Sequence, residues 1–298
     1  MTEGKAVLVT GVTGGIGHAL TTALAARGYT VYAAARGELP ADLARLPGVR
    51  PLRFDLTDPA AVEAAAARVR EDRAGNGLHA VVNNAGIIVQ GPVELVPADE
   101  LRRQFEINVY GPMAVTRAFL PLLREGRGRV VNVSAPTARL AMPYNGPISA
   151  SKAALESFSA AARVELAPFR IPVSIVRPGA VRTAIFGKAE TAARKSLAQI
   201  DPRVVDLYRP GLDAVERATA RTAGAEPGGV VKTLVKAVEA RRPKAVYNAG
   251  RDARLLLTIS RLPVRVRDRV LAGALGLRAA AEAGAGAPGG APAGDGAR

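Results

Sequence analysis

A glycine-rich segment near the amino terminus is the first part of the chain whose residue types suggest chemistry. Residues 10–17 read TGVTGGIG and follow an apolar run at 6–10. Glycines let a backbone approach a pyrophosphate closely, and a helix that starts there adds amide donors and the positive end of its dipole. A glycine pattern alone also fits a tight turn. The predicted strand–turn–helix context is the one that dinucleotide binding requires.

The end of the second expected strand bears on which dinucleotide would bind. A carboxylate at this position would bind the adenine ribose hydroxyls and repel a 2′-phosphate. The chain instead reads Ala33-Ala34-Ala35-Arg36, and the Arg36 guanidinium suits a phosphate. A solvated arginine at the start of a loop is the alternative interpretation. We predict NADP(H) rather than NAD(H).

The elements that must position these residues alternate along the chain. Apolar runs predict strands at 6–10, 30–35, 49–54, 79–83, 129–134, 173–177 and 245–248. Helical spacing predicts helices at about 15–27, 59–73, 98–124, 147–166 and 230–239. This alternation predicts an α/β fold, with one Rossmann-type, doubly wound parallel sheet and helices on both faces.

Composition sets wider limits. The 298 residues are 48% hydrophobic and 22% charged, which is typical of a globular chain. Cysteine is absent and histidine occurs twice, so disulfides, thiol chemistry and a histidine-rich metal site are excluded; we expect no metal. The sequence has no apolar run of about 18 or more residues and goes directly into an expected strand without a cleavable signal, so a cytoplasmic location is expected. The net charge of +15 is scattered, aromatic residues are few, and nucleic-acid binding is not favoured.

Several further motifs occur in a familiar order. Asp55 follows the third expected strand, Asn83-Asn84-Ala85-Gly86 closes the fourth, Asn108-Val109-Tyr110-Gly111 lies in the long helix, and 178–183 read PGAVRT. With the TGxxxGxG spacing, they resemble the short-chain dehydrogenase/reductase family over about residues 5–250, in a pattern near the hydroxysteroid and retinol dehydrogenases. The resemblance and the loop chemistry assign the cofactor to Gly11, Thr13, Gly15, Ile16, Gly17, Arg36, Asp55, Leu56, Asn84, Ala85, Gly86, Lys152, Pro178, Gly179, Val181 and Thr183.

The resemblance also implies four catalytic positions, and two of them lack their hydroxyls. Asn108 and Lys152 match the family's asparagine and lysine, which hold a relay water and the nicotinamide ribose. The position four residues before Lys152 is Ile148 rather than tyrosine, and the serine position thirteen residues earlier is Ala135. A positioned general acid is worth about 10²–10⁴ in rate, and a lost oxyanion donor costs roughly 10²–10³. Ordinary carbonyl reduction should therefore be very slow.

Other groups near these positions are candidates to replace the missing hydroxyls. Ser134 is adjacent to Ala135, but alternation along a strand should point it away from the substrate. Tyr144 lies in a Pro-Tyr-Asn-Gly-Pro turn before the helix, where we expect it to line the substrate mouth rather than replace the missing tyrosine. Lys152 could act as an acid, and the substrate or water could supply the proton.

Three functions remain open. The favoured hypothesis is an NADP-binding enzyme with altered chemistry, either reduction of a C=C or C=N bond or a non-redox step, on a small lipophilic substrate. The second is a pseudoenzyme that senses the cofactor or binds a partner. The third is an ordinary carbonyl or alcohol oxidoreductase, either with an unrecognised proton donor or carrying engineered residues at 148 and 135. The apolar faces of 98–124 and 147–166 resemble the family's dimer bundle, so a homodimer or tetramer is expected.

The carboxyl-terminal part divides into three segments. Residues 184–224 are expected to cover the substrate. Residues 254–280 form a basic, amphipathic helical region whose stretch 254–277 would either pack on its own domain, the favoured interpretation, or contact a membrane surface. Residues 283–298 repeat Ala, Gly and Pro and predict a disordered tail. The domain is expected to span 1–282.

Overall fold

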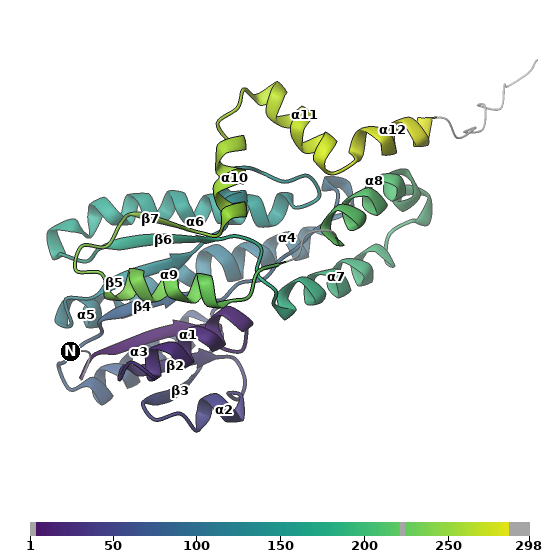
Figure 1. Ribbon diagram of the computed structural model, residues 1–298. Coiled ribbons are helices and arrows are strands. Elements are labelled where there is room, and N and C mark those ends of the chain that lie inside the picture. The colour runs from purple at the N-terminus through teal and green to yellow at the C-terminus, as the bar shows by residue number, and fades with distance from the viewer. Residues whose placement is uncertain (1–3, 221–223, 286–298) are drawn as a thin grey trace, which may run out of the picture.

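Seven parallel strands form one sheet in the computed structural model, which describes residues 4–220 and 224–285 (Figure 1). The strand order is β3-β2-β1-β4-β5-β6-β7. The strands are β1 (Ala6–Thr10), β2 (Thr30–Ala35), β3 (Val49–Arg53), β4 (Ala80–Asn83), β5 (Arg129–Val133), β6 (Val173–Pro178) and β7 (Val246–Ala249). The predicted doubly wound sheet is confirmed, and its strands start and end within one residue of the predicted bounds.

Helices cover both faces of the sheet, because successive strand residues point to opposite sides. Val7 and Val9 of β1 point into a core shared with α1 and α9, whereas Ala6 and Leu8 point into a second core shared with α3, α5 and α6. These helices are α1 (Gly15–Ala25), α3 (Pro59–Arg73), α5 (Gly111–Glu125), α6 (Gly146–Glu165) and α9 (Gly228–Glu239). A parallel sheet buried on both faces explains the near-continuous apolar strands.

The predicted long helix at 98–124 contains an irregular turn. Helix α4 (Ala98–Phe105) continues through a π-helical turn, η2 (Glu106–Tyr110), into α5. Such turns are frequent at functional sites, and this one carries Asn108. The short helix α2 (Ala41–Ala44) was not predicted, because four residues are too few to show a helical period.

The carboxyl ends of the strands define where a ligand can bind. From the central pair β1 and β4, the chain builds outward in opposite directions. In open α/β sheets, ligands bind in the crevice beyond the carboxyl ends of the strands at such a switch point. The segment expected to cover the substrate forms α7 (Ala184–Leu197) and α8 (Pro202–Ala220) beside this edge, as Figure 1 shows.

The basic region near the carboxyl terminus forms three helices. They are α10 (Arg251–Ile259), α11 (Val264–Ala274) and α12 (Leu277–Ala285). Pro263 separates the first two because proline disfavours a helical residue before it. Helix α10 packs on β7 and α12 packs on α8, but α11 projects from the body (Figure 1). The predicted packing on the domain thus holds only for the two ends of the region.

The carboxyl-terminal end of the chain is described as far as residue 285. Helix α12 reaches Ala285, so residues 283–285 of the expected tail lie in a helix, and 286–298 lie outside the described residues. Within residues 4–220 and 224–285, no helix has both the length and the apolar character needed to cross a bilayer.

Candidate functional site

The glycine-rich loop after β1 packs so closely against its neighbours that larger residues would not fit. Gly11 has a φ of +71°, and a Cβ there would lie 2.6 Å from Cα of Ala85. A Cβ at Gly17 would approach Nδ2 of Asn84 to 2.6 Å, and one at Gly15 would approach Cγ2 of Thr183 to 2.8 Å. The loop is therefore a cradle that only glycine can form at these positions.

Side-chain hydrogen bonds from the neighbouring strand fix this loop. The backbone N–H groups of Asn84 and Ala85 donate to Oγ1 of Thr10 over 3.0 and 3.1 Å. The Asn84 amide in turn donates to the carbonyl oxygens of Thr10 and Gly11 over 2.9 and 3.2 Å. The ends of β1 and β4 are thus locked together at the switch point.

Arg36 and Asp55 lie together where β2 and β3 end. The Nε of Arg53 donates to the carbonyl oxygen of Arg36 over 3.1 Å, which fixes the backbone at that position. Burial would raise the pKa of Asp55, but hydrogen bonds from Thr57 and the nearby charge of Arg36 lower it overall. This end of the crevice therefore presents a guanidinium and a carboxylate that remains ionised.

One cavity of about 440 Å³ runs along the carboxyl edge of the sheet. Its wall includes every residue that the sequence analysis assigned to the cofactor. It also includes residues that the sequence analysis did not assign: Thr10, Gly14, Ala34, Ala35, Phe54, Ile87, Ile88, Arg103, Ile107, Val133, Ser134, Ala184, Ile185, Phe186, Lys188, Ala189 and Ala192. Those from α7 were signalled only as part of a covering segment, because no motif marks individual residues there.

The opposite end of this cavity contains Ile148, Ala135 and Lys152. Ile148 lies in the first turn of α6 and is 8% exposed. Neither its side chain nor that of Ala135 can donate a hydrogen bond. Lys152 follows one helical turn later on the same face of α6. The two positions that lack a hydroxyl and the retained lysine therefore share one site.

Lys152 is held by the adjacent strand. Its Nζ donates to the carbonyl oxygen of Val133 over 2.7 Å. Burial lowers the pKa of Lys152 to about 8, against the opposing effect of the Glu156 carboxylate. The group is thus an ammonium near neutral pH that loses its proton more readily than an exposed lysine.

Asn108 lies beside the cavity rather than in its wall. Its Oδ1 accepts from the N–H of Ile87 over 2.9 Å, and its Nδ2 donates to the carbonyl oxygen of Ile87 over 3.0 Å. A Cβ on Gly86 would lie 3.2 Å from Oδ1 of Asn108 and 3.7 Å from Nζ of Lys152. Asn108 therefore braces the 86–87 backbone against the π-helical turn, next to the lysine.

The Ser134 hydroxyl forms a hydrogen bond with a buried ion pair outside the reacting end. It donates to Oε1 of Glu156 over 2.8 Å, and Glu156 forms a bidentate ion pair with Arg177, with both hydrogen bonds at 2.6 Å. The side chains of Arg177 and Glu156 are only 11% and 7% exposed. Ser134 lines the cavity but has its proton engaged in this buried network.

Tyr144 lies outside the wall of this cavity and contacts α8. It has a φ of 63° and its hydroxyl lies against Gly211 of α8, so the side chain is absent from the cavity wall. The left-handed backbone in the turn between Pro143 and Pro147 turns Tyr144 towards α8. Tyr144 thus contacts the segment expected to cover the substrate, and its place at the substrate mouth stays a prediction.

Comparisons with known proteins agree with this arrangement. Residues 5–194 match the family model for short chain dehydrogenase. Mouse (Mus musculus) retinol dehydrogenase 5 is 35% identical over 277 residues, covering 89% of this chain and 87% of the relative. A short-chain dehydrogenase structure from Streptomyces avermitilis has a TM-score of 0.69 at 29% identity and covers 94% of this chain and 98% of its own. One from Burkholderia cenocepacia in complex with NADP has a TM-score of 0.66 at 28% identity and covers 87% and 93%.

The family match spans well over half of the chain, and the relative covers most of it. The glycine cradle, the Asn84 bridge and the lysine on α6 lie within the matched residues. The chain belongs to the short-chain dehydrogenase/reductase family.

Proposed function

We propose that this protein binds NADP(H) and acts on a small lipophilic substrate by chemistry that does not use the family's tyrosine and serine. One observation carries the proposal: a single cavity joins a complete cofactor cradle to a reacting end where Ile148 and Ala135 offer no hydroxyl. Such a site favours reduction of a C=C or C=N bond, or a non-redox step, over carbonyl reduction.

The cradle fits a dinucleotide. The close contacts of Gly11, Gly15 and Gly17 allow backbone approach to a pyrophosphate at the start of α1. Arg36 suits a 2′-phosphate, and no acidic residue precedes it at the end of β2 to repel one. The NADP complex of the Burkholderia cenocepacia relative supports a nicotinamide dinucleotide in this crevice, and the choice of NADP(H) rests on Arg36. When bound, the nicotinamide would supply or accept a hydride.

The chain's own residues would orient the reactants and exclude water. Lys152 would hold the nicotinamide ribose, and Asn108 would keep the 86–87 backbone in place beside it. Ile148 and Ala135 would present an apolar surface to the substrate. Lys152, whose pKa is lowered by burial, is one group in the cavity wall able to release a proton; otherwise the substrate or a water molecule must supply it.

The substrate class follows from the rest of the wall. Ile87, Ile88, Ile107, Ile185 and Phe186 add apolar surface beside Ile148. A pocket lined in this way binds mainly by removing apolar surface from water. The retinol dehydrogenase relative supports a lipophilic molecule. Helix α7 would cover it.

Stopped-flow spectroscopy of the purified full-length chain tests the proposal. We expect NADPH to bind more tightly than NADH, and we expect bound NADPH to lose its reduced-nicotinamide absorbance with an activated alkene or an imine but not with a ketone. Turnover without that loss would assign a non-redox step. Rapid reduction of simple ketones would overturn the proposal and assign an ordinary oxidoreductase with a proton donor elsewhere in the cavity.

A pseudoenzyme is the second candidate, and the hydrogen bonds favour it in one respect. Lys152 is bonded to Val133 and Asn108 to Ile87, so both retained residues have structural roles that need no reaction. In that case NADPH should bind and raise the Tm, while alkene, imine and ketone substrates all remain unchanged. Binding of a partner protein that depends on NADPH would then indicate the function of the pseudoenzyme.

The assembly is also a proposal. Helices α5 and α6 each present one face to the sheet, and Val164 and Phe169 near the end of α6 are 75% and 52% exposed. We infer that these helices form a homodimer or tetramer contact. Analytical ultracentrifugation of wild type and Val164→Glu should show a concentration-dependent shift towards monomer in the variant.

A further inference from the structure

Helices α10 and α11, with the short link between them, expose several large apolar side chains close together. Leu255 is 62% exposed, Leu262 37%, Val264 59%, Val266 42% and Val270 39%. All five lie in one stretch of sixteen residues, 255–270, whereas exposed large hydrophobic side chains elsewhere are scattered. Contiguous exposed apolar surface marks an interaction site more often than a free face. We therefore expect residues 255–270 to form an interaction surface.

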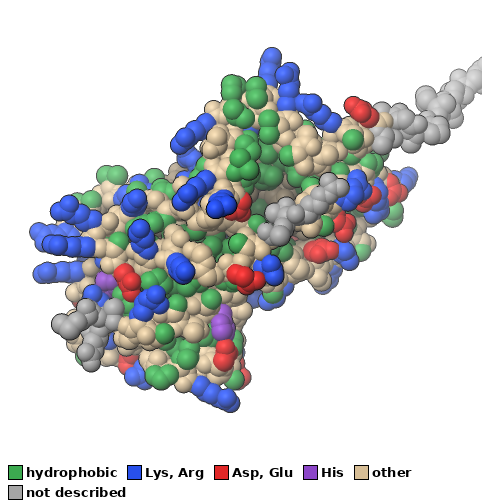
Figure 2. Space-filling model, viewed as in Figure 1, with side chains coloured by type: hydrophobic (Ala, Val, Ile, Leu, Met, Phe, Trp, Pro, Cys, Tyr) green, Lys and Arg blue, Asp and Glu red, His purple; other side chains and the backbone are tan. Residues whose placement is uncertain are grey.

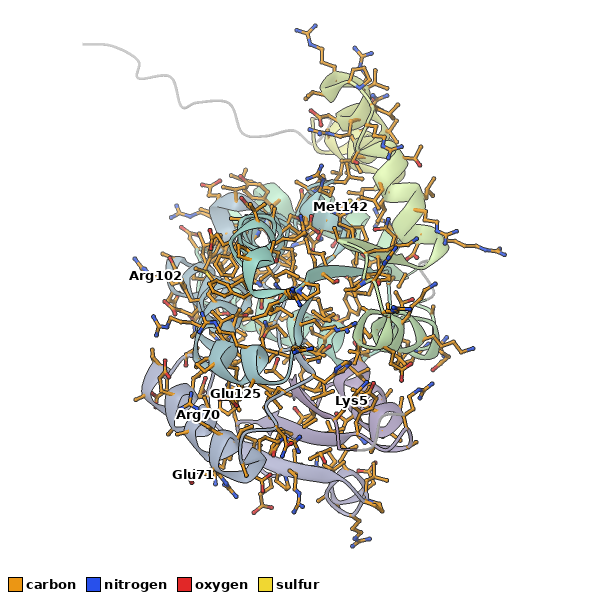
Figure 3. The ribbon with its side chains drawn as sticks, turned by 90° about the vertical axis from the view of Figure 1, so that its left-hand side faces the viewer. Lys5, Arg70, Glu71, Arg102, Glu125 and Met142 are labelled. Atoms are coloured by element: carbon orange, nitrogen blue, oxygen red, sulfur yellow. The ribbon has the colours of Figure 1, made fainter. Side chains whose placement is uncertain are left out.

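The same stretch is strongly basic. Residues 251–278 contain seven arginines and two aspartates, a net charge of +5. Asp252 is turned inward, where its Oδ2 accepts from the N–H of Ala180 over 2.6 Å, and Asp268 lies 3.5 Å from Arg267. Figure 2 shows basic side chains around an apolar patch on the protruding helices, and Figure 3 shows nitrogen-tipped side chains that project outward from them. Arginines and apolar residues thus share one surface on α10 and α11, and residues 251–274 are here called the arm.

A second pocket lies at the base of the arm. It has a volume of about 450 Å³ and is lined by Ala138, Arg139, Arg177, Asn248, Leu257, Ser260 and Arg261. Arg177 is ion-paired with Glu156, whereas Arg139 and Arg261 have no ion pair with any residue in the described part of the chain. Two free guanidiniums beside hydroxyl and amide groups suit a phosphate.

The combination decides the kind of partner. A nucleic acid would leave the valines and leucines without a partner, and residues 251–278 contain no aromatic side chain to stack on a base. A second copy of the arm would bring two strongly positive surfaces together. An anionic bilayer accommodates both features, because the headgroup region attracts arginines and the acyl boundary receives apolar side chains.

We propose that the α10–α11 arm is an interfacial docking surface for anionic phospholipid bilayers, with the phosphate of one headgroup bound in the pocket of Arg139 and Arg261. The arm lies on the membrane without crossing it. Each arginine near the surface should contribute about fivefold in affinity, which added salt would screen. The proposal is independent of the reaction in the substrate cavity.

Vesicle flotation of the full-length protein tests the docking surface. Vesicles of phosphatidylcholine with phosphatidylglycerol should capture the protein, and pure phosphatidylcholine vesicles should not. The charge variant Arg254→Glu/Arg265→Glu/Arg269→Glu and the apolar variant Leu255→Ser/Val264→Ser/Val270→Ser should each weaken capture at least tenfold. The control Arg50→Glu/Arg68→Glu/Arg70→Glu makes the same change in net charge on exposed residues of β3 and α3. It should bind like wild type.

The remaining outcomes separate the alternatives. Equal capture by both kinds of vesicle, or equal loss in the control, would overturn the proposal in favour of bulk charge or nonspecific adhesion. Capture of duplex DNA that is lost in the charge variant but kept in the apolar variant would assign a nucleic acid instead. Binding of inorganic phosphate that is abolished by Arg139→Ala/Arg261→Ala, without vesicle capture, would assign a soluble anion. Circular dichroism and Tm measurements check that each variant is folded.

Discussion

The two ends of the cavity along the carboxyl edge of the sheet differ in how they match the family resemblance. At the cofactor end, Gly11, Gly15 and Gly17 meet neighbouring atoms so closely that a Cβ would collide. At the reacting end, Ile148 and Ala135 fill positions where the family resemblance implies a tyrosine and a serine, and the fold accepts them. Cofactor binding depends on backbone geometry that the sheet itself fixes, whereas catalysis depends on single hydroxyls that can be lost without disturbing packing.

The reason lies in what each residue contributes to the folded state. Ile148 is a buried apolar side chain on the inner face of α6, so it contributes favourably to burial. A larger residue at Gly17 would press on the backbone of Gly11 and on the Asn84 amide, which also anchors β4 to β1. A substitution at Ile148 should therefore disturb packing little, whereas one at Gly17 should destabilise the loop between β1 and α1.

The largest expected effect comes from restoring the reacting end. Ile148→Tyr with Ala135→Ser should raise carbonyl reductase activity by about 10⁴ or more, because a general acid and an oxyanion donor return together. Steady-state kinetics over a panel of ketones and aldehydes measures it. Ile148→Phe with Ala135→Ser is the matched control, since it adds the ring without the hydroxyl and should stay inactive. An inactive tyrosine variant that still binds NADPH would show that the pocket itself has diverged.

Damage to the cofactor end should have the next largest effect. Gly17→Ala should weaken NADPH binding by about 10- to 100-fold, because overpacking of a tight site costs about 1–3 kcal/mol. Isothermal titration calorimetry gives the Kd. Gly228→Ala serves as the control, since a Cβ at that residue meets nothing within 4 Å. Unchanged affinity in Gly17→Ala would contradict the assignment of the loop.

Cofactor preference tests one residue of the cradle. Arg36→Glu should shift the ratio of NADPH to NADH affinity by about 10- to 100-fold towards NADH, because a charge-assisted hydrogen bond is worth about 1.5–3 kcal/mol. Fluorescence titration with both cofactors measures the ratio. Arg68→Glu on the exposed face of α3 makes the same charge change and should leave the ratio unaltered. An unaltered ratio in Arg36→Glu itself would remove the case for NADP(H).

The smallest expected effect concerns Lys152. Its pKa of about 8 means that it is charged below that pH and neutral above it, so NADPH affinity should fall about fivefold as the pH rises from 7 to 9. The 2′-phosphate titrates near pH 6 and does not interfere. Titrations at several pH values measure the slope. In Lys152→Met the affinity should be lower and flat over the same interval; a slope that persists there would assign the titration to another group.

The strands and the ligand crevice could be predicted from the sequence, because each depends on residue patterns within a short segment. Valine-rich runs and turn residues gave the strands to within one residue, and the glycine pattern after β1 predicted the crevice. The four-residue α2 and the three-helix division of the carboxyl-terminal region were missed. A single helical turn shows no period, and a basic-apolar alternation does not reveal which of its faces finds a neighbour.

The sequence by itself determined the family, the parallel sheet, the cofactor cradle and the absence of hydroxyls at 148 and 135, because each is a matter of residue type and spacing. Only the tertiary structure decided that Tyr144 packs on α8, that Ser134 donates to the buried Glu156–Arg177 pair, and that α11 projects from the body with its valines exposed. Those outcomes depend on contacts between segments far apart in the chain. No local pattern can fix such contacts.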